Sequence, residues 1–429
     1  MTTPAVLPYD RLLRLRRGRR DPLRFLESLA RRGPVVAFRL QNQPAFLLND
    51  PGMIHDALVT HDVRFAKPAA LERATRLLGR GLLTAPATLH AARRKTTLPA
   101  FQRHRMHRYA DVIITHATRW RAARHEGETL DAVQEMAGLT LGVVGESFFT
   151  TDLRPVAAEL RDILATAVDA LDPLVSLIAP ARHLRPVRDR LDAIVHDLIE
   201  TRMASDPMPD DLLTLLIGAP GPEATPRQLH DDVLTMLLAG HDTIANALTW
   251  TWGWLGEHPE AEAAMHAEID TVLGSRAASM EDVPKLVYTR AVLTESLRLT
   301  PPAWVIARKA IDDHRFDGVT VPAGSLVLMS PYVMHRDARY FDDPFTFDPS
   351  RWLGDAPARL PKLAYFPFGA GRRSCVGEAF AWLEGVLVLA SIAQRWQLRP
   401  LHGKGEVDPR ITLRPRGPMM VRVTGRYQA

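Results

Sequence analysis

The feature that most limits the possible folds is a helical pattern that continues from about residue 50 to residue 300. A further apolar segment near 226–257 predicts a long helix, and connectors rich in Pro, Gly and Asp precede it. Apolar residues recur at three- and four-residue spacing, as they do in amphipathic helices, in the segments "DVIITHATRWRAARHEG", "VAAELRDILATAVDALDPLVSLI" and "LDAIVHDLIETRM". The pattern predicts a mainly α protein.

Short strands are predicted only on either side of this helical stretch. Near the start, "PVVAFRL" and "PAFLLND" flank the polar connection "QNQ" and predict a β-hairpin. After residue 300, "FDGVTVPAGSLVLMSPY" predicts a second hairpin, "GEAFAWLEGVLVLASIAQRW" returns to helix, and "ITLRPRGPMMVRV" predicts short terminal strands. Because no linker is long enough to separate independent domains, we expect residues 1–429 to form one α-rich domain with small sheets at its edge.

Composition and charge exclude several classes of protein. The chain has 429 residues, a formal net charge of +5 and a single cysteine. Such a small positive excess argues against a dedicated nucleic-acid binder. No secretory signal and no apolar run of about 18 residues is visible. We therefore expect a soluble, cytoplasmic protein without a transmembrane anchor.

The single cysteine, Cys375, lies in the unusual segment "FPFGAGRRSCVGEAF". A strongly helical segment follows, so we expect the sulfur at a helix N-terminus, where the dipole favours a thiolate. Gly371 and Gly377 allow a tight turn and the close approach of a flat, bulky group. Phe368 can cover the sulfur from one side, and Arg373 offers a cation to an anionic carboxylate.

Three kinds of chemistry can use such a thiol. A structural zinc site needs about four ligands, and no second cysteine exists. A nucleophilic cysteine needs a histidine base, and none lies nearby in sequence. One thiolate on a metal that another group already holds is what haem requires. Haem ligation is therefore favoured, with an inert structural thiol as the alternative.

The spacing of the cysteine segment is similar to the haem-binding signature of the cytochrome P-450 family, the haem-thiolate monooxygenases. It has the form Phe368-x-x-Gly371-x-Arg373-x-Cys375-x-Gly377. The resemblance, to soluble bacterial-type members, covers nearly the whole chain. It implies the fold of that family, mainly α with small β-sheets. It also implies haem b between a long central distal helix and the proximal helix of the cysteine loop, with Cys375 as the metal ligand and Phe368 and Gly377 at the haem.

A second motif is the pair Glu295 and Arg298 in "VLTESLRLTPP". By itself an i, i+3 pair is common on helix surfaces and contributes little. In the resembled family the pair is buried and locked to a downstream arginine, whose position Arg351 matches in "FDPSRWL". Ser350 stands where that family usually has an acidic residue. The resemblance implies a structural ion network that supports the cysteine loop.

A third motif interrupts the apolar helix "LTMLLAGHDTIANALTW" with Ala239-Gly240 followed by polar residues. Gly and Thr weaken or bend a helix there, although the segment could simply be a helix with solvated polar groups. The motif is similar to the oxygen-binding signature of the family. The resemblance implies that Gly240 leaves room for dioxygen, that Thr243 hydrogen-bonds the bound oxygen, and that Asp242 relays protons.

The two propionates of a haem require cations. His90 and Arg94 lie at i and i+4 in "HAARRKTTLPAF", hence on one helical face. The resemblance implies that these residues, together with Arg308 in "PPAWVIARKA" and Arg373, contact the propionates. A solvated basic face is the alternative interpretation of the same run.

We expect electrons to come from separate proteins, because no flavin or iron–sulfur module is visible in the sequence. Arg93, Lys95 and Arg372 would lie on the cysteine side of the haem, as a docking surface for an acidic donor. We expect a ferredoxin with its NAD(P)H reductase as the donor, and a monomeric enzyme.

The substrate is expected to be an apolar small molecule, and a terpenoid or polyketide secondary metabolite is our choice. The resemblance implies a pocket lined by the segment 65–89 and by Leu238, Ala239, Ala303, Trp304, Val305, Ile306 and Thr412.

We predict a monooxygenase that inserts one oxygen atom from O2. A haem-thiolate enzyme with another outcome (peroxide-driven oxidation, rearrangement or oxidative coupling) is the first alternative. A non-redox carrier of hydrophobic ligands is the second. The pair Asp231-Asp232 resembles the acidic cluster of terpene cyclases, but no third carboxylate follows at the needed spacing.

Overall fold

A computed structural model of the chain describes residues 7–8, 21–40, 43–157, 159–160, 163, 166, 185–220 and 224–426. Most of the helix predicted over 156–178 lies outside these residues. The chain divides into two compact units. The first, here the sheet unit, comprises Met1–Arg73, Arg298–Thr346 and Asp355–Cys375; the second, the helical unit, comprises Ala74–Leu297, Phe347–Gly354 and Val376–Ala429. A single domain over 1–429 stays a prediction.

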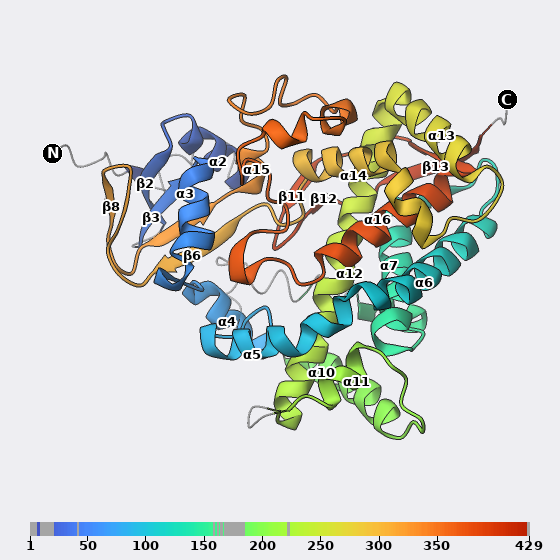
Figure 1. The fold of residues 1–429 in the computed structure, drawn as a ribbon, viewed down its shortest axis with the longest axis horizontal. Helices are drawn as coiled ribbons and strands as arrows, with labels where there is room; N and C mark the ends of the chain where they lie inside the picture. The colour runs from blue at the N-terminus through green and yellow to red at the C-terminus, as the bar shows by residue number, and fades with distance from the viewer. Residues whose placement is uncertain are drawn as a thin grey trace. The chain divides into compact units, whose positions relative to one another are not determined.

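The sheet unit is built on a six-stranded mixed sheet (Figure 1). In spatial order its strands are β1 (Leu7–Pro8), β2 (Val35–Leu40), β3 (Gln43–Leu48), β9 (Leu326–Met329), β6 (Ile306–Ala310) and β4 (Phe65–Ala66). The antiparallel pair β2–β3, with Val35 opposite Leu48, confirms the first predicted hairpin. Strand β3 pairs in parallel with β9, which pairs antiparallel with β6.

The second predicted hairpin is wrong as a single unit. Its first part, β7 (His314–Phe316) and β8 (Val319–Val321), forms a separate two-stranded sheet. Asp317 and Gly318 join them with φ of 43° and 81°, the signature of a tight type I′ turn. This turn closes the hairpin early, so the next strand, β9, is free to enter the six-stranded sheet.

The core of the sheet unit follows from the alternation of side chains along its strands. Val36 and Phe38 of β2 face one hydrophobic cluster, and Ala37 between them faces another. Helix α2 (Pro22–Ala30) covers the first cluster, with Phe25 edge-on to Phe38 at 5.5 Å between ring centroids. The other short helices of the unit are α3 (Pro51–His55) and α15 (Pro331–Met334).

The helical unit is organised around α12 (Pro226–Glu257), a helix of 32 residues and therefore about 48 Å long. Thr225 caps it by accepting a hydrogen bond from the Gln228 N–H, and Pro226 occupies its first position. It packs against α7 and α16 (Figure 1). The other helices wholly or partly in this unit are α4 (Ala69–Leu78), α5 (Ala87–Thr97), α6 (Arg103–Ala122), α7 (Ala132–Phe149), α10 (Arg185–Met203), α11 (Leu212–Ile217), α13 (Pro259–Leu273), α14 (Val287–Leu299) and α16 (Glu378–Ala393).

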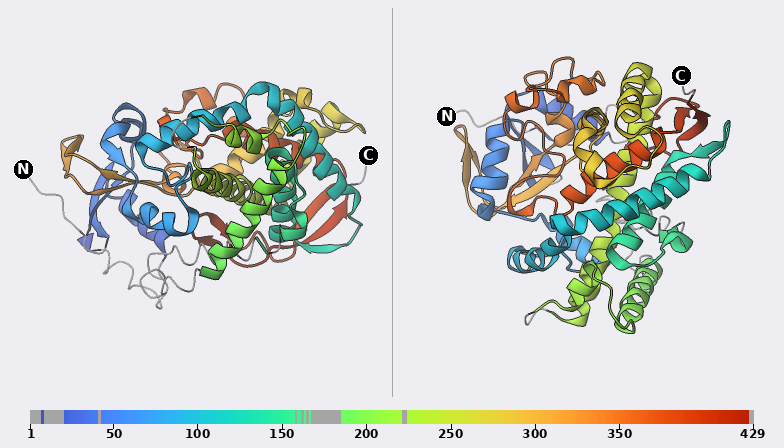
Figure 2. Two further views of the ribbon diagram at one scale, coloured as in Figure 1. Left: turned by 90° about the horizontal axis from the view of Figure 1, so that it is seen from below. Right: turned by 45° about the vertical axis from the view of Figure 1, so that its right-hand side comes forward.

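Two small sheets complete the helical unit and confirm the predicted terminal strands. Strands β10 (Trp396–Pro400), β13 (Met420–Gly425) and β5 (Thr129–Asp131) form an antiparallel sheet in that order. Figure 2 shows β5 beside β13 at the edge of the left-hand view. Strands β11 (Val407–Pro409) and β12 (Leu413–Pro415) form a hairpin. No helix among the described residues is long and apolar enough to cross a membrane.

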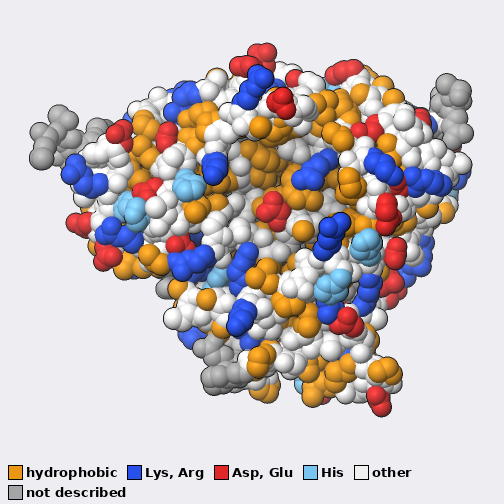
Figure 3. Space-filling view, in the orientation of Figure 1, with side chains coloured by type: hydrophobic (Ala, Val, Ile, Leu, Met, Phe, Trp, Pro, Cys, Tyr) orange, Lys and Arg blue, Asp and Glu red, His pale blue; other side chains and the backbone are white. Residues whose placement is uncertain are grey.

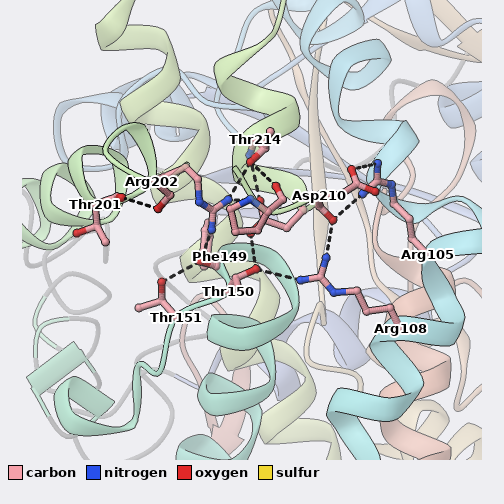
Figure 4. Close-up of polar contacts among 12 residues, drawn as sticks. Arg105, Arg108, Phe149, Thr150, Thr151, Thr201, Arg202, Asp210 and Thr214 are labelled. Carbon is pink, nitrogen blue, oxygen red and sulfur yellow. Dashed lines mark hydrogen bonds and ion pairs between the residues drawn. The ribbon is translucent and has the colours of Figure 1, made fainter. Parts of the chain in front are cut away.

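A buried polar network holds the C-terminal end of α7 to α10 and α11 (Figure 4). Arg202 of α10 forms an ion pair with Asp211, both side chains being almost wholly buried. Its second guanidinium nitrogen donates to the Phe149 carbonyl at 2.7 Å. Asp211 also caps α11 by accepting from the Thr214 N–H at 3.0 Å. The ends of three helices are thereby fixed by one charge pair.

Glu384 of α16 is an acidic residue in the interior of the protein. Its side chain is fully buried, and neither carboxyl oxygen has a hydrogen-bond partner among the described residues. Burial raises the pKa of this carboxyl well above its usual value. The group is therefore neutral in the folded protein at pH values where the unfolded chain is already ionised.

We expect the Glu384→Gln variant to be more stable than the wild type at pH 8, while the two differ little at pH 5. Because the folded state holds a proton that the unfolded state loses near pH 4.5, wild-type stability falls by up to about 1.4 kcal/mol for each pH unit until the folded pKa is reached. Urea unfolding at both pH values measures the difference. Glu378→Gln, at an exposed site on the same helix, is the control. A pH-independent difference would contradict the prediction.

Candidate functional site

The cysteine loop is a compact turn that presents the sulfur at the surface of the described residues. The Cys375 N–H donates to the Phe368 carbonyl at 2.9 Å, and the Ser374 N–H donates to the Gly371 carbonyl at 3.1 Å. Cys375 is exposed. Gly371 has a φ of +70°, and a Cβ there would lie 2.0 Å from the Leu58 carbonyl oxygen. Only glycine fits this position without moving backbone.

The expected position of Cys375 at the helix N-terminus needs a correction. Helix α16 begins at Glu378 with Gly377 as its N-cap, so the sulfur lies two residues before the cap. Gly377 has a φ of −93°, which other residues also adopt. A Cβ at this position would lie 3.6 Å from the Phe101 ring. Neither the backbone conformation nor a close contact among the described residues therefore requires glycine at this position.

Three cationic side chains, those of Lys67, Arg308 and Arg373, lie in the sheet unit near this loop. The sequence had indicated only Arg308 and Arg373. Burial, with the charges of Arg373 and Arg308, lowers the pKa of Lys67 to about 7. Burial and Arg373 lower the pKa of Arg308 to about 10. No pattern in "RFAKPAA" marked Lys67, because its partners come from β6 and from the cysteine loop. The lowered pKa values of Lys67 and Arg308 indicate a concentration of positive charge in a partly desolvated place.

The surroundings of Arg373 test whether this cluster suits a haem propionate. Its Nη1 is buried and has no hydrogen-bond partner among the described residues. The negative charge of Asp62 acts to raise the pKa of both Arg308 and Arg373. This carboxylate already accepts two hydrogen bonds from Arg372, at 2.7 Å each. A buried guanidinium nitrogen without a partner needs an acceptor. The cluster therefore fits a bound carboxylate of the kind that haem carries.

The predicted propionate contacts of the helical unit lie on α5. His90 is buried and Arg94 partly buried, one turn apart on the same face.

The expected docking surface needs a correction at Arg93. This residue is buried in an ion pair with Asp232 and cannot contribute to a docking surface. Despite the attraction of Arg93, burial raises the pKa of Asp232 to about 6. Lys95 and Arg372 remain exposed, and Figure 3 shows positive and negative side chains interspersed on the face that it presents.

The Glu-x-x-Arg motif lies at the end of α14, buried as the resemblance implied. Glu295 accepts from Arg351 Nε at 3.0 Å, from Trp352 Nε1 at 2.7 Å and from the Asp348 N–H at 3.0 Å. Arg298 donates to three carbonyls of the sheet unit, those of His335, Pro344 and Thr346. Sequence reasoning missed Trp352 and these carbonyls, which no spacing rule marks.

Thr243 and Asp242, the alcohol and the acid of the third sequence motif, make different hydrogen bonds. The Thr243 hydroxyl is exposed and donates back to the Ala239 carbonyl at 3.1 Å, a bond that bends helices slightly. Asp242 is partly buried, and its Oδ2 accepts from the Thr412 hydroxyl at 2.9 Å. His241 is buried, and burial lowers its pKa. Its Nδ1 donates to the Leu237 carbonyl at 3.1 Å. Of the three residues, His241 is buried, Asp242 is partly buried and Thr243 is exposed.

Gly240 has a packing role that the motif alone did not indicate. A Cβ at this position would lie 3.2 Å from the Phe148 ring and 3.3 Å from a Val144 methyl group. Its missing side chain thus faces α7 and allows the two helices to approach closely. That Gly240 leaves room for dioxygen stays a prediction. The missing side chain points toward α7, and this orientation does not support the prediction.

The predicted substrate-contact residues fall in both units. In the sheet unit, Trp304 and Val305 pack on the cluster beneath α2, Ile306 packs on the opposite cluster, and Ala303 is exposed. Sequence reasoning treated these residues only as pocket lining, although three of them also complete the core. In the helical unit, Ala239 is exposed, while Leu238 and Thr412 are partly buried.

Among the residues that the structure describes, Asp56, His61 and His314 form a further cluster of side chains that can bind metals. Asp56 accepts from His314 Nε2 at 2.7 Å and also contacts His61 Nδ1. Although burial raises the pKa of Asp56, these two histidines lower it below its usual value. The hydrogen bonds account for the cluster as a structural network.

The cysteine loop, the buried Glu295 and the acid–alcohol pair of Asp242 and Thr243 occur together in haem-thiolate enzymes that use O2. The sequence profile of the family described as Cytochrome P-450 matches residues 7–423. The chain belongs to the cytochrome P-450 family and is a monooxygenase of that family.

Its relatives include three enzymes of Streptomyces. Cyclooctatin synthase of Streptomyces melanosporofaciens is 38% identical over 91% of this chain and 88% of its own. Cyclooctat-9-en-7-ol 5-monooxygenase of the same organism is 35% identical over 90% and 86%. Pentalenene oxygenase of Streptomyces avermitilis is 33% identical over 92% and 89%.

Proposed function

We propose that this protein hydroxylates a terpenoid, with haem b held by the thiolate of Cys375. The observation that carries the proposal is the exposed thiol of the cysteine loop in a chain whose relatives are named for terpenoid oxidation. When bound, the haem supplies the reductive activation of dioxygen. The protein supplies the thiolate, whose electron donation favours O–O cleavage.

The cation cluster would hold the propionates. Arg308 and Arg373 provide two guanidinium groups, and Lys67 adds a third cation in the same unit. His90 and Arg94, on one face of α5, would contribute the remaining contacts. The buried Nη1 of Arg373, for which the described part of the chain offers no hydrogen-bond partner, supports this assignment.

Asp242 and Thr243 would deliver protons to the oxygen site. The Thr243 hydroxyl is the exposed member of the pair, and the Asp242 carboxylate neighbours it on α12. A carboxylate can take a proton from solvent, and a hydroxyl can pass one on while accepting another. Glu295 and Arg351 are proposed to support the cysteine loop and to take no part in the chemistry.

Separate proteins would supply the electrons. An iron–sulfur cluster needs several cysteine ligands, and the sequence contains one cysteine. We propose a ferredoxin with its NAD(P)H-dependent reductase as the donor. Exposed Lys95 and Arg372 are candidates for its contact surface. Cytoplasmic location and a monomeric state stay predictions of the sequence.

The substrate class is tested by adding cyclooctat-9-en-7-ol and pentalenene to the holoenzyme. We expect at least one of them to shift the haem from low to high spin. With a plant ferredoxin, its reductase, NADPH and ¹⁸O₂, we expect a product that carries one ¹⁸O atom by mass spectrometry. Absence of both responses would contradict the terpenoid proposal. Product formed with hydrogen peroxide alone, at the same rate, would favour the peroxide-driven alternative.

A further inference from the structure

One face of α12 is fastened to the turn between β11 and β12. Asp242, Asn246 and Trp250 lie at i, i+4 and i+8, which places them in line along the helix. Asp242 Oδ2 accepts from the Thr412 hydroxyl at 2.9 Å, and Trp250 Nε1 donates to the Leu413 carbonyl at 3.0 Å. Asn246 Nδ2 lies 3.5 Å from the Thr412 hydroxyl oxygen. Successive turns of the helix therefore contact two successive residues of the hairpin.

The turn that carries Thr412 is itself well held. The Arg410 N–H donates to the carbonyls of Asp408 and Thr412, at 3.0 and 3.2 Å. Leu413, next in sequence, is fully buried, and its carbonyl is occupied by Trp250. The position of the Thr412 hydroxyl is thus set by backbone and core contacts on both sides of the residue.

The hydrogen bonds around Asp242 have a defined direction. A threonine hydroxyl has one proton to donate, and a carboxylate can only accept, so Thr412 directs its proton to Asp242. Its oxygen then faces the Asn246 amide as an acceptor. Asn246 also donates to the Asp242 backbone carbonyl at 2.8 Å. Donors in series polarise one another, so the Asp242 carboxylate is oriented by a chain that begins at Asn246 and passes through Thr412.

We propose that Thr412 is a positioning residue for proton delivery: its hydroxyl fixes the orientation of the Asp242 carboxylate. Thr412 acts through Asp242 and takes no proton itself. The inference rests on the proposed role of Asp242 as a proton relay. It differs from the expectation that Thr412 only lines the substrate pocket, because a lining role would need its methyl group and not its hydroxyl.

The test compares Thr412→Val, which keeps the shape and loses the hydroxyl, with Thr412→Ser, which keeps the hydroxyl. Each is made in the wild type and in Asp242→Asn, and the holoenzymes are studied without substrate. One readout is NADPH oxidation driven by a plant ferredoxin and its reductase, in H2O and D2O. The other is the infrared stretching frequency of carbon monoxide bound to the reduced haem, which senses nearby dipoles. Thr271→Val, at an exposed site on α13, is the control.

In the wild-type background we expect Thr412→Val to slow NADPH oxidation about tenfold, the effect of losing one hydrogen bond to a charged group. Its solvent isotope effect should rise and its carbon monoxide band should shift. Thr412→Ser and Thr271→Val should remain within about twofold of the wild type. In the Asp242→Asn background, Thr412→Val should add almost nothing, because the two residues act as one unit.

Two results would overturn the inference. One is a Thr412→Val holoenzyme with wild-type rate, isotope effect and carbon monoxide band. The other is an equal effect of Thr412→Val with and without Asp242→Asn, which would show a packing role. The proposed function fails separately: if Asp242→Asn leaves the rate and the isotope effect unchanged, Asp242 is not the relay, whatever Thr412 does.

Discussion

Replacing Cys375 with histidine should abolish the strongly red-shifted Soret band that the reduced carbon monoxide complex of the wild type is expected to show. A histidine can occupy an axial position on haem iron but donates less electron density than a thiolate. We therefore expect the variant to retain haem and to show the band of an ordinary haem protein. Monooxygenase turnover should fall by about a thousandfold or more, because the thiolate favours O–O cleavage.

Haem content and circular dichroism provide the control for this prediction. Cys375→Ala should lose both the red-shifted band and much of the haem, while the helical signal stays near that of the wild type. Because Cys375 is exposed, the fold should tolerate both substitutions. Persistence of the red-shifted band in either variant would contradict ligation by Cys375.

Removing Glu295 should destabilise the protein by about 3–5 kcal/mol, because it breaks a buried ion pair and leaves its partners uncompensated. The carboxylate is fully buried and accepts from Arg351, from Trp352 and from the Asp348 N–H. Glu295→Ala leaves all three donors without this acceptor. We expect a large fall in the midpoint of urea unfolding and poor retention of haem.

The matched control is Glu406→Ala, which removes an ion pair with Arg416 that is exposed on both sides. Exposed pairs contribute at most about 1 kcal/mol, so this variant should unfold near the wild-type midpoint. If Glu295→Ala and Glu406→Ala lowered stability equally, the network around Glu295 would be no more important than a surface contact.

Local patterns were sufficient for most of the secondary structure. The α12 helix was predicted from its apolar periodicity and its connectors, and the β2–β3 hairpin from two apolar runs around a polar connection. Prediction failed within 316–332, where the tight Asp317–Gly318 turn separates β9 from the hairpin before it. The partner of a strand is chosen by the sheet that is available, and the sequence of that strand does not contain this information.

The candidate site also combines residues that the sequence indicated with residues whose surroundings it did not. Cys375, Glu295, Asp242 and Thr243 belong to short motifs, in which residue type and spacing already express the chemistry. Lys67 does not, because its pKa near 7 arises from burial beside cations that are distant in the chain. Arg93 is the opposite case: it belongs to a basic run, yet its side chain is buried against Asp232.

The sequence by itself determined the family, the expected ligand cysteine and the acid–alcohol pair, because each is encoded within about ten consecutive residues. Only the tertiary structure decided which groups surround them. The Thr412 hydroxyl meets the Asp242 carboxylate across 170 positions, and Trp352 meets Glu295 across 57. Such contacts depend on how helices and hairpins pack, and hydrogen bonds a few ångströms long are set only once that packing is complete.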